Sequence, residues 1–319
     1  MTIVAADWQA YALPLRRPWR SSQGDINERH GKLLRLQDDV GRIGWGDCAP
    51  LPEFGIGEAA ATAFAEETAL LDLAAQKAGL PLNTWLSGEA AVQNIAVNSI
   101  LGAVFDVTPT DLSATIEKGF RVLKLKVGTG PWSEEIIQLH KLAAASKGQV
   151  QFRVDANKAW TMRDAWAFLD ACRDLPIESL EEPLTNPTPE ALAKLQAITR
   201  FPLAIDESVE LINNHFFRAP PVRRLIIKPA RFGGLLKSMA IGLQARAAGI
   251  ECVVTSSLES NCGLLACAHL AAAIAPQGTH GLATAEWFTG NTGKTDLIDR
   301  GVLPLSSQAG LGFQQTPER

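Results

Sequence analysis

The sequence predicts an α/β protein in which a (β/α)7β TIM-like barrel follows an N-terminal α+β domain. From about residue 93 onward, short apolar segments alternate with helical segments at intervals of roughly 25 residues, as parallel βα units do. Before residue 93, three strand-like segments precede one long alanine-rich helix. We therefore expect the domain limits 1–92, 93–286 and 287–319, with the last segment returning to the N-terminal domain.

The N-terminal domain is expected to contain an antiparallel sheet and one helix. Asp38-Asp39-Val40-Gly41 predicts a hairpin turn, and a helix is expected from Glu58 to Ala78. Residues 14–31 are expected to form a long loop that holds Arg20, and loops of this length are usually functional or disordered. The strands are expected at 3–13, 32–37 and 42–47.

The barrel is expected to contain eight strands with seven helices between them. Thr161 and Thr188 stand where helix N-caps are needed, and Gly249 stands where a helix should end. These signals support the alternation of strand and helix. The expected strands are 94–98, 122–127, 151–155, 177–181, 202–206, 225–228, 251–255 and 281–285.

The composition is that of a soluble globular protein. Of 319 residues, 46% are hydrophobic, which excludes a disordered chain, and the net charge of −4 argues against a nucleic-acid partner. No secretory signal is evident, and the apolar segment 264–275 is too short to cross a bilayer, so no membrane partner is expected. Five cysteines without a CxxC pair indicate buried thiols in a cytoplasmic protein. We expect a monomer or a small homo-oligomer.

Charged residues stand at the C-terminal ends of predicted strands, although parallel barrel strands are normally apolar. Asp155, Glu181 and Asp206 follow one another at intervals of 26 and 25 residues, and Lys228 follows 22 residues later. Each therefore lies one βα unit further along, at the end of the barrel where active sites are found. Structural salt bridges are the alternative, but several buried ions on one face need a shared purpose. The set is Lys124, Lys126, Arg153, Asp155, Glu181, Asp206 and Lys228.

Three converging carboxylates cannot all stay ionised without a cation. Oxygen ligands favour Mg²⁺ first and Mn²⁺ second. Lys126 and Lys228 are expected on opposite sides of the metal strands, and a partly buried lysine near a cation has a lowered pKa and can act as a general base. This combination predicts abstraction of the proton α to a carboxylate in a small-molecule substrate, with the metal stabilising an ene-diolate.

Seven segments carry a resemblance to a known family. They resemble the enolase superfamily in the subgroup of muconate lactonizing enzymes, whose chemistry is the one just described. Within that subgroup, they are most similar to the o-succinylbenzoate synthase family of menaquinone biosynthesis. The segments are GWGDCAPLPEFG (44–55), LKLKVG (123–128), FRVDANKAW (152–160), LEEPL (180–184), AIDES (204–208), IIKPARFGGL (226–235) and TSSLESNCGL (255–264).

The resemblance implies a role for each residue at the strand ends. Asp155, Glu181 and Asp206 would bind Mg²⁺. Lys126 would take the α-proton and then, as an acid, help hydroxide leave, while Lys228 would stabilise the enolate from the opposite face. The implied reaction is syn elimination of water from 2-succinyl-6-hydroxy-2,4-cyclohexadiene-1-carboxylate, which yields 2-succinylbenzoate, so the implied enzyme is a carbon–oxygen lyase.

The resemblance also implies substrate contacts. Lys124 would support Lys126 and contact the substrate carboxylate, and Arg153 would lie near the substrate. Ser256 and Ser257 would anchor the succinyl carboxylate. Arg20 would reach the substrate from the N-terminal domain, which caps the barrel in this family.

Three alternative functions and one alternative metal ligand stay open. The protein could be an N-acylamino-acid racemase or a dipeptide epimerase of the same subgroup, or a non-catalytic metal-binding barrel. Dipeptide epimerases of this subgroup carry two aspartates on the last strand, where this chain has Ala283-Thr284-Ala285-Glu286. Glu182 could replace Glu181 as the metal ligand, because side-chain alternation alone does not decide which of the two faces inward.

Overall fold

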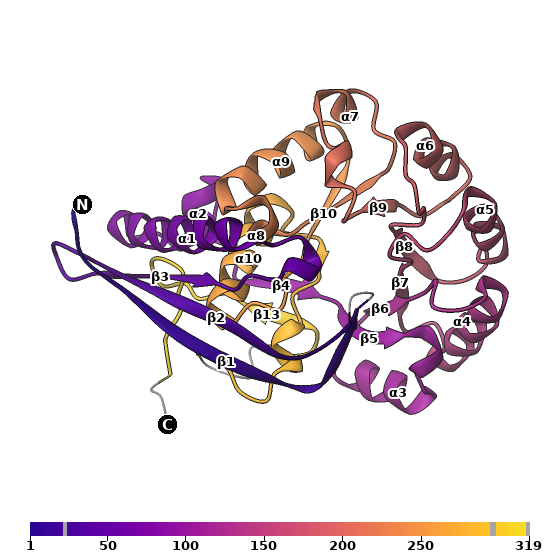
Figure 1. The fold of residues 1–319 in the computed structure, drawn as a ribbon, viewed down its shortest axis with the longest axis horizontal. Coiled ribbons are helices and arrows are strands. Elements are labelled where there is room, and N and C mark those ends of the chain that lie inside the picture. The colour runs from indigo at the N-terminus through magenta and orange to yellow at the C-terminus, as the bar shows by residue number, and fades with distance from the viewer. Residues whose placement is uncertain (22–23, 294–297, 317–319) are drawn as a thin grey trace. The chain divides into compact units, whose positions relative to one another are not determined.

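The computed structural model describes residues 1–21, 24–293 and 298–316. The chain divides into two compact units (Figure 1). The first unit comprises Met1–Ala96, Ile227–Gly242 and Val254–Arg319, and the second comprises Val97–Ile226 and Leu243–Val253. The limits 1–92, 93–286 and 287–319 that the sequence suggests stay a prediction.

The first unit contains a three-stranded antiparallel sheet in the order β1-β2-β3. The expectation of a loop at residues 14–31 is wrong. In the described residues, β1 and β2 continue as one long hairpin, with a register shift between Pro14 and Trp19. The ladder continues because pairing satisfies backbone groups whatever the polarity of the side chains. Arg20 pairs with Asp25, but its side chain and residues 22–23 lie outside the described part. The strands are β1 Ile3–Ser21, β2 Gly24–Asp38 and β3 Ile43–Cys48.

The predicted turn and helix of the first unit are confirmed. Gly41 N donates to Asp38 O across the turn, and α1 spans Glu58–Ala78. The helix packs tightly on β3, since a Cβ atom at Gly46 would lie 1.9 Å from the carbonyl oxygen of Ala65. Only glycine allows so close an approach.

A second small sheet of the first unit has the order β12-β4-β13. It corrects two expectations. The strand expected at 94–98 is β4, which pairs with β13, so the barrel sheet begins one strand later. The strand expected at 281–285 is replaced by one bridge between Thr255 and Gly281 and a 3-10 helix, because short apolar runs do not determine secondary structure by themselves. The elements of this unit are α2 Leu82–Ser87, β4 Asn94–Val97, α8 Pro229–Phe232, α10 Asn261–Ile274, β12 Thr279–His280, η4 Thr284–Trp287 and β13 Val302–Pro304.

The second unit is built on a curled seven-stranded sheet in the order β11-β10-β9-β8-β7-β6-β5, and β5 to β10 pair in parallel. Helices α4, α5 and α6 lie on its outer side (Figure 1). The expected α/β class, with a parallel sheet and a separate antiparallel N-terminal sheet, is confirmed. The strands are β5 Ser99–Ala103, β6 Val122–Lys126, β7 Gln151–Asp155, β8 Ile177–Glu181, β9 Leu203–Ile205, β10 Arg224–Ile227 and β11 Glu251–Val254.

The predicted helix signals are also confirmed. The Thr161 hydroxyl accepts a hydrogen bond from Asp164 N, and the Thr188 hydroxyl accepts one from Ala191 N. Gly249 follows α9 with a φ of 74°, a conformation that suits glycine at a helix end. None of the helices in the described ranges is long and apolar enough to span a bilayer. The helices are α3 Pro109–Glu117, α4 Trp132–Ser146, α5 Met162–Ala171, α6 Pro189–Ala197, α7 Asn214–Arg218 and α9 Leu235–Ala247.

The register of three neighbouring strands brings functional candidates to one level. Lys126 of β6 pairs with Asp155 of β7, and Asp155 pairs with Glu181 of β8. The register of β7 and β8 shifts by one residue earlier in the strands, since Phe152 pairs with Ile177 whereas Arg153 pairs with Ser179. Glu178 is therefore an extra residue in β8, as in a β-bulge.

Candidate active site

Three predicted carboxylates lie at the carboxyl ends of consecutive strands of the second unit. Asp155 and Glu181 end β7 and β8, and Asp206 follows β9. Each is at most 3% exposed. The Lys124 ammonium, from β6, lies 2.8 Å from Asp155 Oδ2 and 2.8 Å from Glu181 Oε2. The structure therefore gathers Lys124 and these carboxylates into one buried cluster.

The charge state of Lys124 follows from these neighbours. Burial alone would lower its pKa, but the negative charges of Asp155, Glu181 and Asp206 outweigh burial and raise it. Lys124 therefore stays protonated in this arrangement. Lys126 is two residues further along β6, half-buried, and faces the same side of the sheet as Lys124 by strand alternation.

A hard cation requires several oxygen donors around one point. Within residues 1–21, 24–293 and 298–316, no group of three histidine, cysteine or acidic side chains has the geometry of a metal site. Lys124 instead supplies the positive charge between Asp155 and Glu181. The proposed donor atoms are all carboxylate oxygens of buried residues, which is the ligand type that Mg²⁺ prefers. This composition fits Mg²⁺.

Glu181 and Glu182 occupy different surroundings. Glu181 joins the cluster through Lys124. The Glu182 carboxylate accepts hydrogen bonds from Asp206 N at 2.7 Å, Ser208 N at 2.8 Å and Ser208 Oγ at 2.8 Å. Burial, followed by the charge of Glu207, raises the pKa of Glu182 to about 7. Glu181 therefore lies with Lys124, whereas Glu182 binds the turn after β9, and the choice of Glu181 as the metal ligand stays a prediction.

Arg153 lies in a second charged network, formed by residues earlier in the same strands. Its guanidinium donates to Asn98 Oδ1 at 2.9 Å and to both carboxylate oxygens of Glu178, at 3.1 and 3.2 Å. Arg224 of β10 donates to Glu178 at 2.6 Å and to Glu251 of β11 at 2.6 Å. Arg153 is 2% exposed, so protein groups surround the side chain, and its contact with substrate stays a prediction.

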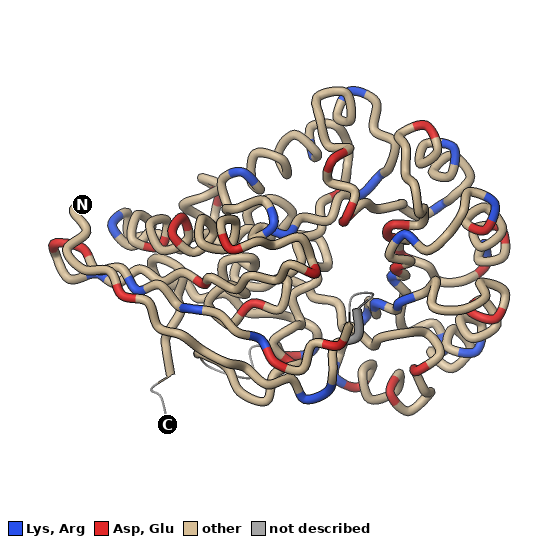
Figure 2. Tube along the Cα trace, in the orientation of Figure 1, with Lys and Arg blue, Asp and Glu red and all other residues tan. Residues whose placement is uncertain are grey.

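Sequence reasoning missed the partners in this network. Burial would raise the pKa of Glu178, but Arg153 and Arg224 outweigh it and lower that pKa to about 2. The available signal was a charge inside a strand that should be apolar, which applies to both Glu178 and Arg224. Acidic and basic residues lie close together along this sheet in Figure 2.

Three other predicted residues lie in the first unit. Lys228 directly precedes α8, and its ammonium lies 5.3 Å from the ring centroid of Phe54. The Ser256 hydroxyl forms a hydrogen bond with the Thr284 hydroxyl, and Ser257 N donates to Glu259 Oε2 at 2.5 Å. Burial raises the pKa of Glu259 to about 7.

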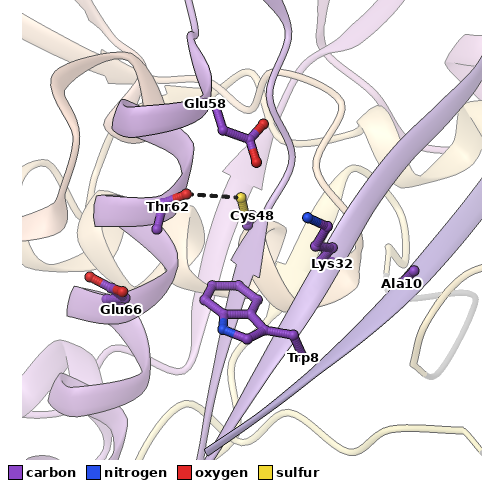
Figure 3. A pocket seen from close by; sticks show the side chains of 7 residues that line it. All are labelled: Trp8, Ala10, Lys32, Cys48, Glu58, Thr62 and Glu66. Atoms are coloured by element: carbon purple, nitrogen blue, oxygen red, sulfur yellow. Dashed lines mark hydrogen bonds between the residues drawn. The ribbon is translucent and has the colours of Figure 1, made fainter.

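The first unit also contains a pocket of about 470 Å³ between its sheet and α1 (Figure 3). Cys48 Sγ lies 3.6 Å from Thr62 Oγ1, and burial raises the pKa of this thiol, so it is not a thiolate at neutral pH. The charged side chains of the pocket are exposed and hydrated, and none of the predicted catalytic residues lines it. The lining residues are Trp8, Ala10, Lys32, Cys48, Glu58, Thr62 and Glu66.

Sequence comparison identifies relatives over most of the chain. Residues 110–319 match the family described as Enolase C-terminal domain-like. The o-succinylbenzoate synthase of Edwardsiella ictaluri is 32% identical over 294 residues, covering 86% of this chain and 88% of that protein. The L-Ala-D/L-Glu epimerase of Bacillus subtilis is 26% identical over 322 residues, covering 85% of each.

Solved structures share the fold across nearly the whole chain. The dipeptide epimerase from Methylococcus capsulatus, complexed with Mg and the dipeptide L-Arg-D-Lys, has a TM-score of 0.86 at 25% identity, covering 98% of this chain and 99% of that one. The muconate lactonizing enzyme from Pseudomonas fluorescens, complexed with muconolactone, has a TM-score of 0.86 at 21% identity, covering 99% and 97%. A barrel fold with an N-terminal antiparallel sheet is thus established. The chain belongs to the enolase superfamily, in the subgroup of muconate lactonizing enzymes.

Proposed function

We propose that the protein is a Mg²⁺-dependent o-succinylbenzoate synthase, a lyase that eliminates water from 2-succinyl-6-hydroxy-2,4-cyclohexadiene-1-carboxylate. The observation that carries the proposal is the buried cluster of Asp155, Glu181 and Asp206 around Lys124, with Lys126 beside it on β6. Several relatives that are 30–32% identical are o-succinylbenzoate synthases.

The chain's own residues would divide the reaction as follows. Asp155, Glu181 and Asp206 would hold Mg²⁺, which when bound supplies Lewis-acid polarisation of the substrate carboxylate. Lys126 removes the α-proton and then, as the conjugate acid, protonates the departing hydroxyl group on the same face. Lys124, whose pKa is raised by its carboxylate neighbours, stays a cation and favours the neutral form of Lys126.

The remaining candidates would bind and orient the substrate. Lys228 stabilises the negative charge that develops on the substrate, and Ser256 and Ser257 bind its succinyl carboxylate. Arg153 and Arg20 are further candidates for substrate contact. Because the product is aromatic, its formation supplies much of the driving force, and the protein mainly has to make one C–H bond more acidic.

A direct assay tests the proposal. The purified protein is incubated with the cyclohexadiene substrate in Mg²⁺ and, separately, in EDTA, and aromatisation is followed by ultraviolet absorbance. We expect turnover in Mg²⁺ and none in EDTA. Mn²⁺ is expected to replace Mg²⁺, because it accepts the same oxygen ligands. An absence of metal-dependent turnover would reject the synthase proposal.

The second candidate is an N-acylamino-acid racemase or a dipeptide epimerase. Epimerases occur among the relatives at 24–32% identity. The last-strand aspartate pair expected for dipeptide epimerases is absent, since the segment Thr284–Trp287 is a 3-10 helix with Glu286 as its acidic residue. Exchange of the α-proton in deuterated water, measured by NMR on an N-succinylamino acid and on L-Ala-L-Glu, distinguishes this candidate from the synthase. Loss of that exchange in Lys228→Ala would support a mechanism with two lysines.

A non-catalytic metal-binding barrel is the candidate from another class. A scaffold needs neither Lys126 nor Lys228, and both are present. The aromatisation and exchange assays together test it, because a scaffold is inactive in both while still binding metal.

A further inference from the structure

Glu182 is a buried carboxylate that the proposed chemistry does not use. Its side chain is fully buried, and its backbone φ is 44°. This left-handed conformation is uncommon for a residue with a Cβ atom and persists only where the surroundings hold it in place. The contacts of Glu182 show what those surroundings are.

On one side, Glu182 binds the turn after β9. Its Oε1 accepts hydrogen bonds from Asp206 N at 2.7 Å and Ser208 N at 2.8 Å, and its Oε2 accepts one from Ser208 Oγ at 2.8 Å. Its own N–H donates to Ala204 O at 3.0 Å. All four hydrogen bonds go to the segment that carries Asp206.

On the other side, Glu182 binds the turn after β7. Its carbonyl oxygen accepts a hydrogen bond from Lys158 N at 2.7 Å, and the preceding carbonyl, of Glu181, accepts one from Ala156 N at 3.0 Å. The same turn is held to Asp155, because Asn157 N donates to Asp155 Oδ1 at 3.0 Å. One residue therefore links the turns that follow β7 and β9.

We infer that Glu182 is a positioning residue that holds Asp206 and Asp155 in place on either side of Glu181. The inference rests on the metal site proposed above and deepens it. The Glu182 side chain holds the turn after β9 at both Asp206 and Ser208, because both backbone N–H groups donate to the same oxygen. Outer-shell partners of this kind typically contribute 10- to 100-fold to metal affinity.

A buried carboxylate that binds backbone N–H groups also stabilises the fold, so a matched control is needed. Glu135 of α4 provides it. Glu135 is equally buried, and its carboxylate accepts from Gly128 N at 2.8 Å, Thr129 N at 2.9 Å and Gly130 N at 3.3 Å. It holds the turn after β6, which carries none of the three proposed metal ligands.

The test compares Glu182→Gln, Ser208→Ala and Glu135→Gln with the wild-type chain. The Kd for Mn²⁺ is measured without substrate by electron paramagnetic resonance, and Tm is measured in EDTA. We expect Glu182→Gln to weaken Mn²⁺ binding by roughly 10- to 100-fold. Ser208→Ala, which loses one hydrogen bond, should weaken it by a smaller but measurable factor. Glu135→Gln should keep the wild-type Kd for Mn²⁺, even if its Tm falls as much as that of Glu182→Gln. Saturating Mg²⁺ should restore the kcat of Glu182→Gln, because a positioning residue acts through metal occupancy.

Two results would overturn the inference: a wild-type Kd in Glu182→Gln, or an equal loss of affinity in Glu182→Gln and Glu135→Gln. If Glu182→Gln does not fold, Ser208→Ala decides, and an unchanged Kd in that variant overturns the inference. The wild-type chain separates this failure from failure of the proposed site. If the wild-type protein binds no Mn²⁺, or if Asp206→Asn binds Mn²⁺ as tightly as the wild type does, the metal site itself is rejected.

Discussion

The second unit contains two clusters of charge that share strands β7 and β8, and they differ in composition. Near the carboxyl ends, the acidic cluster places the carboxylates of Asp155, Glu181 and Asp206 around Lys124, with Lys126 further along β6. Earlier in the strands, the balanced cluster pairs two arginines with two carboxylates. That cluster consists of Arg153, Arg224, Glu178 and Glu251.

The difference distinguishes a network of mutually paired charges from the proposed metal site. Buried ions are stable when paired and hydrogen-bonded, and the balanced cluster meets this condition with its own residues. The acidic cluster is the one for which we propose a further cation. Burial of charged side chains alone therefore does not indicate function.

The largest effect is expected from a change in the acidic cluster. Asp206→Asn removes one proposed metal ligand and should lower turnover by at least about 10³-fold, since a bound metal contributes several kcal/mol to transition-state stabilisation. The circular dichroism spectrum and Tm should remain close to those of the wild type. Near-wild-type turnover in this variant would show that the metal site is misassigned.

A change in the balanced cluster should lower stability and leave metal binding unchanged. Arg224→Met leaves Glu178 with one cationic partner fewer, and breaking a buried pair costs about 3–5 kcal/mol of unfolding free energy. Urea denaturation measures this loss, and the Kd for Mn²⁺ should not change. A variant with weakened Mn²⁺ binding but intact stability would abolish the distinction between the two clusters.

Acid should weaken the balanced cluster through Glu178. Its folded pKa of about 2 lies below the ordinary 4.5, so the unfolded chain binds more protons between these values. The stabilisation is complete above pH 4.5 and is lost as pH falls toward 2, by about 3 kcal/mol in total. Urea midpoints measured from pH 6 to pH 3 should therefore fall less steeply in Glu178→Gln than in the wild type. Equal slopes would contradict the low pKa of Glu178.

The smallest effect is expected at a helix end that neither cluster uses. Thr161→Ala removes the hydrogen bond that caps α5 and should cost about 1 kcal/mol of unfolding free energy. Turnover and metal affinity should match the wild type. This variant shows the effect of a purely local loss of stability. A fall in its metal affinity would mean that general destabilisation alone can weaken Mn²⁺ binding.

Regular periodic segments were predictable from the sequence. The helix Glu58–Ala78 and the strands Gln151–Asp155 and Ile177–Glu181 have the expected limits, because their patterns and flanking signals agree. The hairpin at residues 14–31 was not predictable, since its exposed residues lack alternation and only backbone pairing continues the strands. The missing strand at 281–285 shows the same limit for a short apolar run.

The candidate site was predictable to the level of residue types at strand ends, and the structure places Lys124 with Asp155 and Glu181. The partners of Arg153 were not predictable, because Asn98 and Glu178 reach it from other parts of the chain. Long-range side-chain pairing of this kind leaves no local pattern in the chain.

The extra residue at Glu178 sets the register of the C-terminal end of β8 relative to β7. If β8 paired regularly after Phe152 and Ile177, with Glu178 opposite Arg153, then Asp155 would face Leu180 and Glu181 would turn toward the helices. The bulge thus decides which side chain is presented at the level of Asp155. Deleting Glu178 alone would leave Glu181 opposite Asp155 and would instead remove the carboxylate that pairs with Arg153 and Arg224. The register within a strand can therefore determine the chemistry of a site as directly as the identity of its residues does.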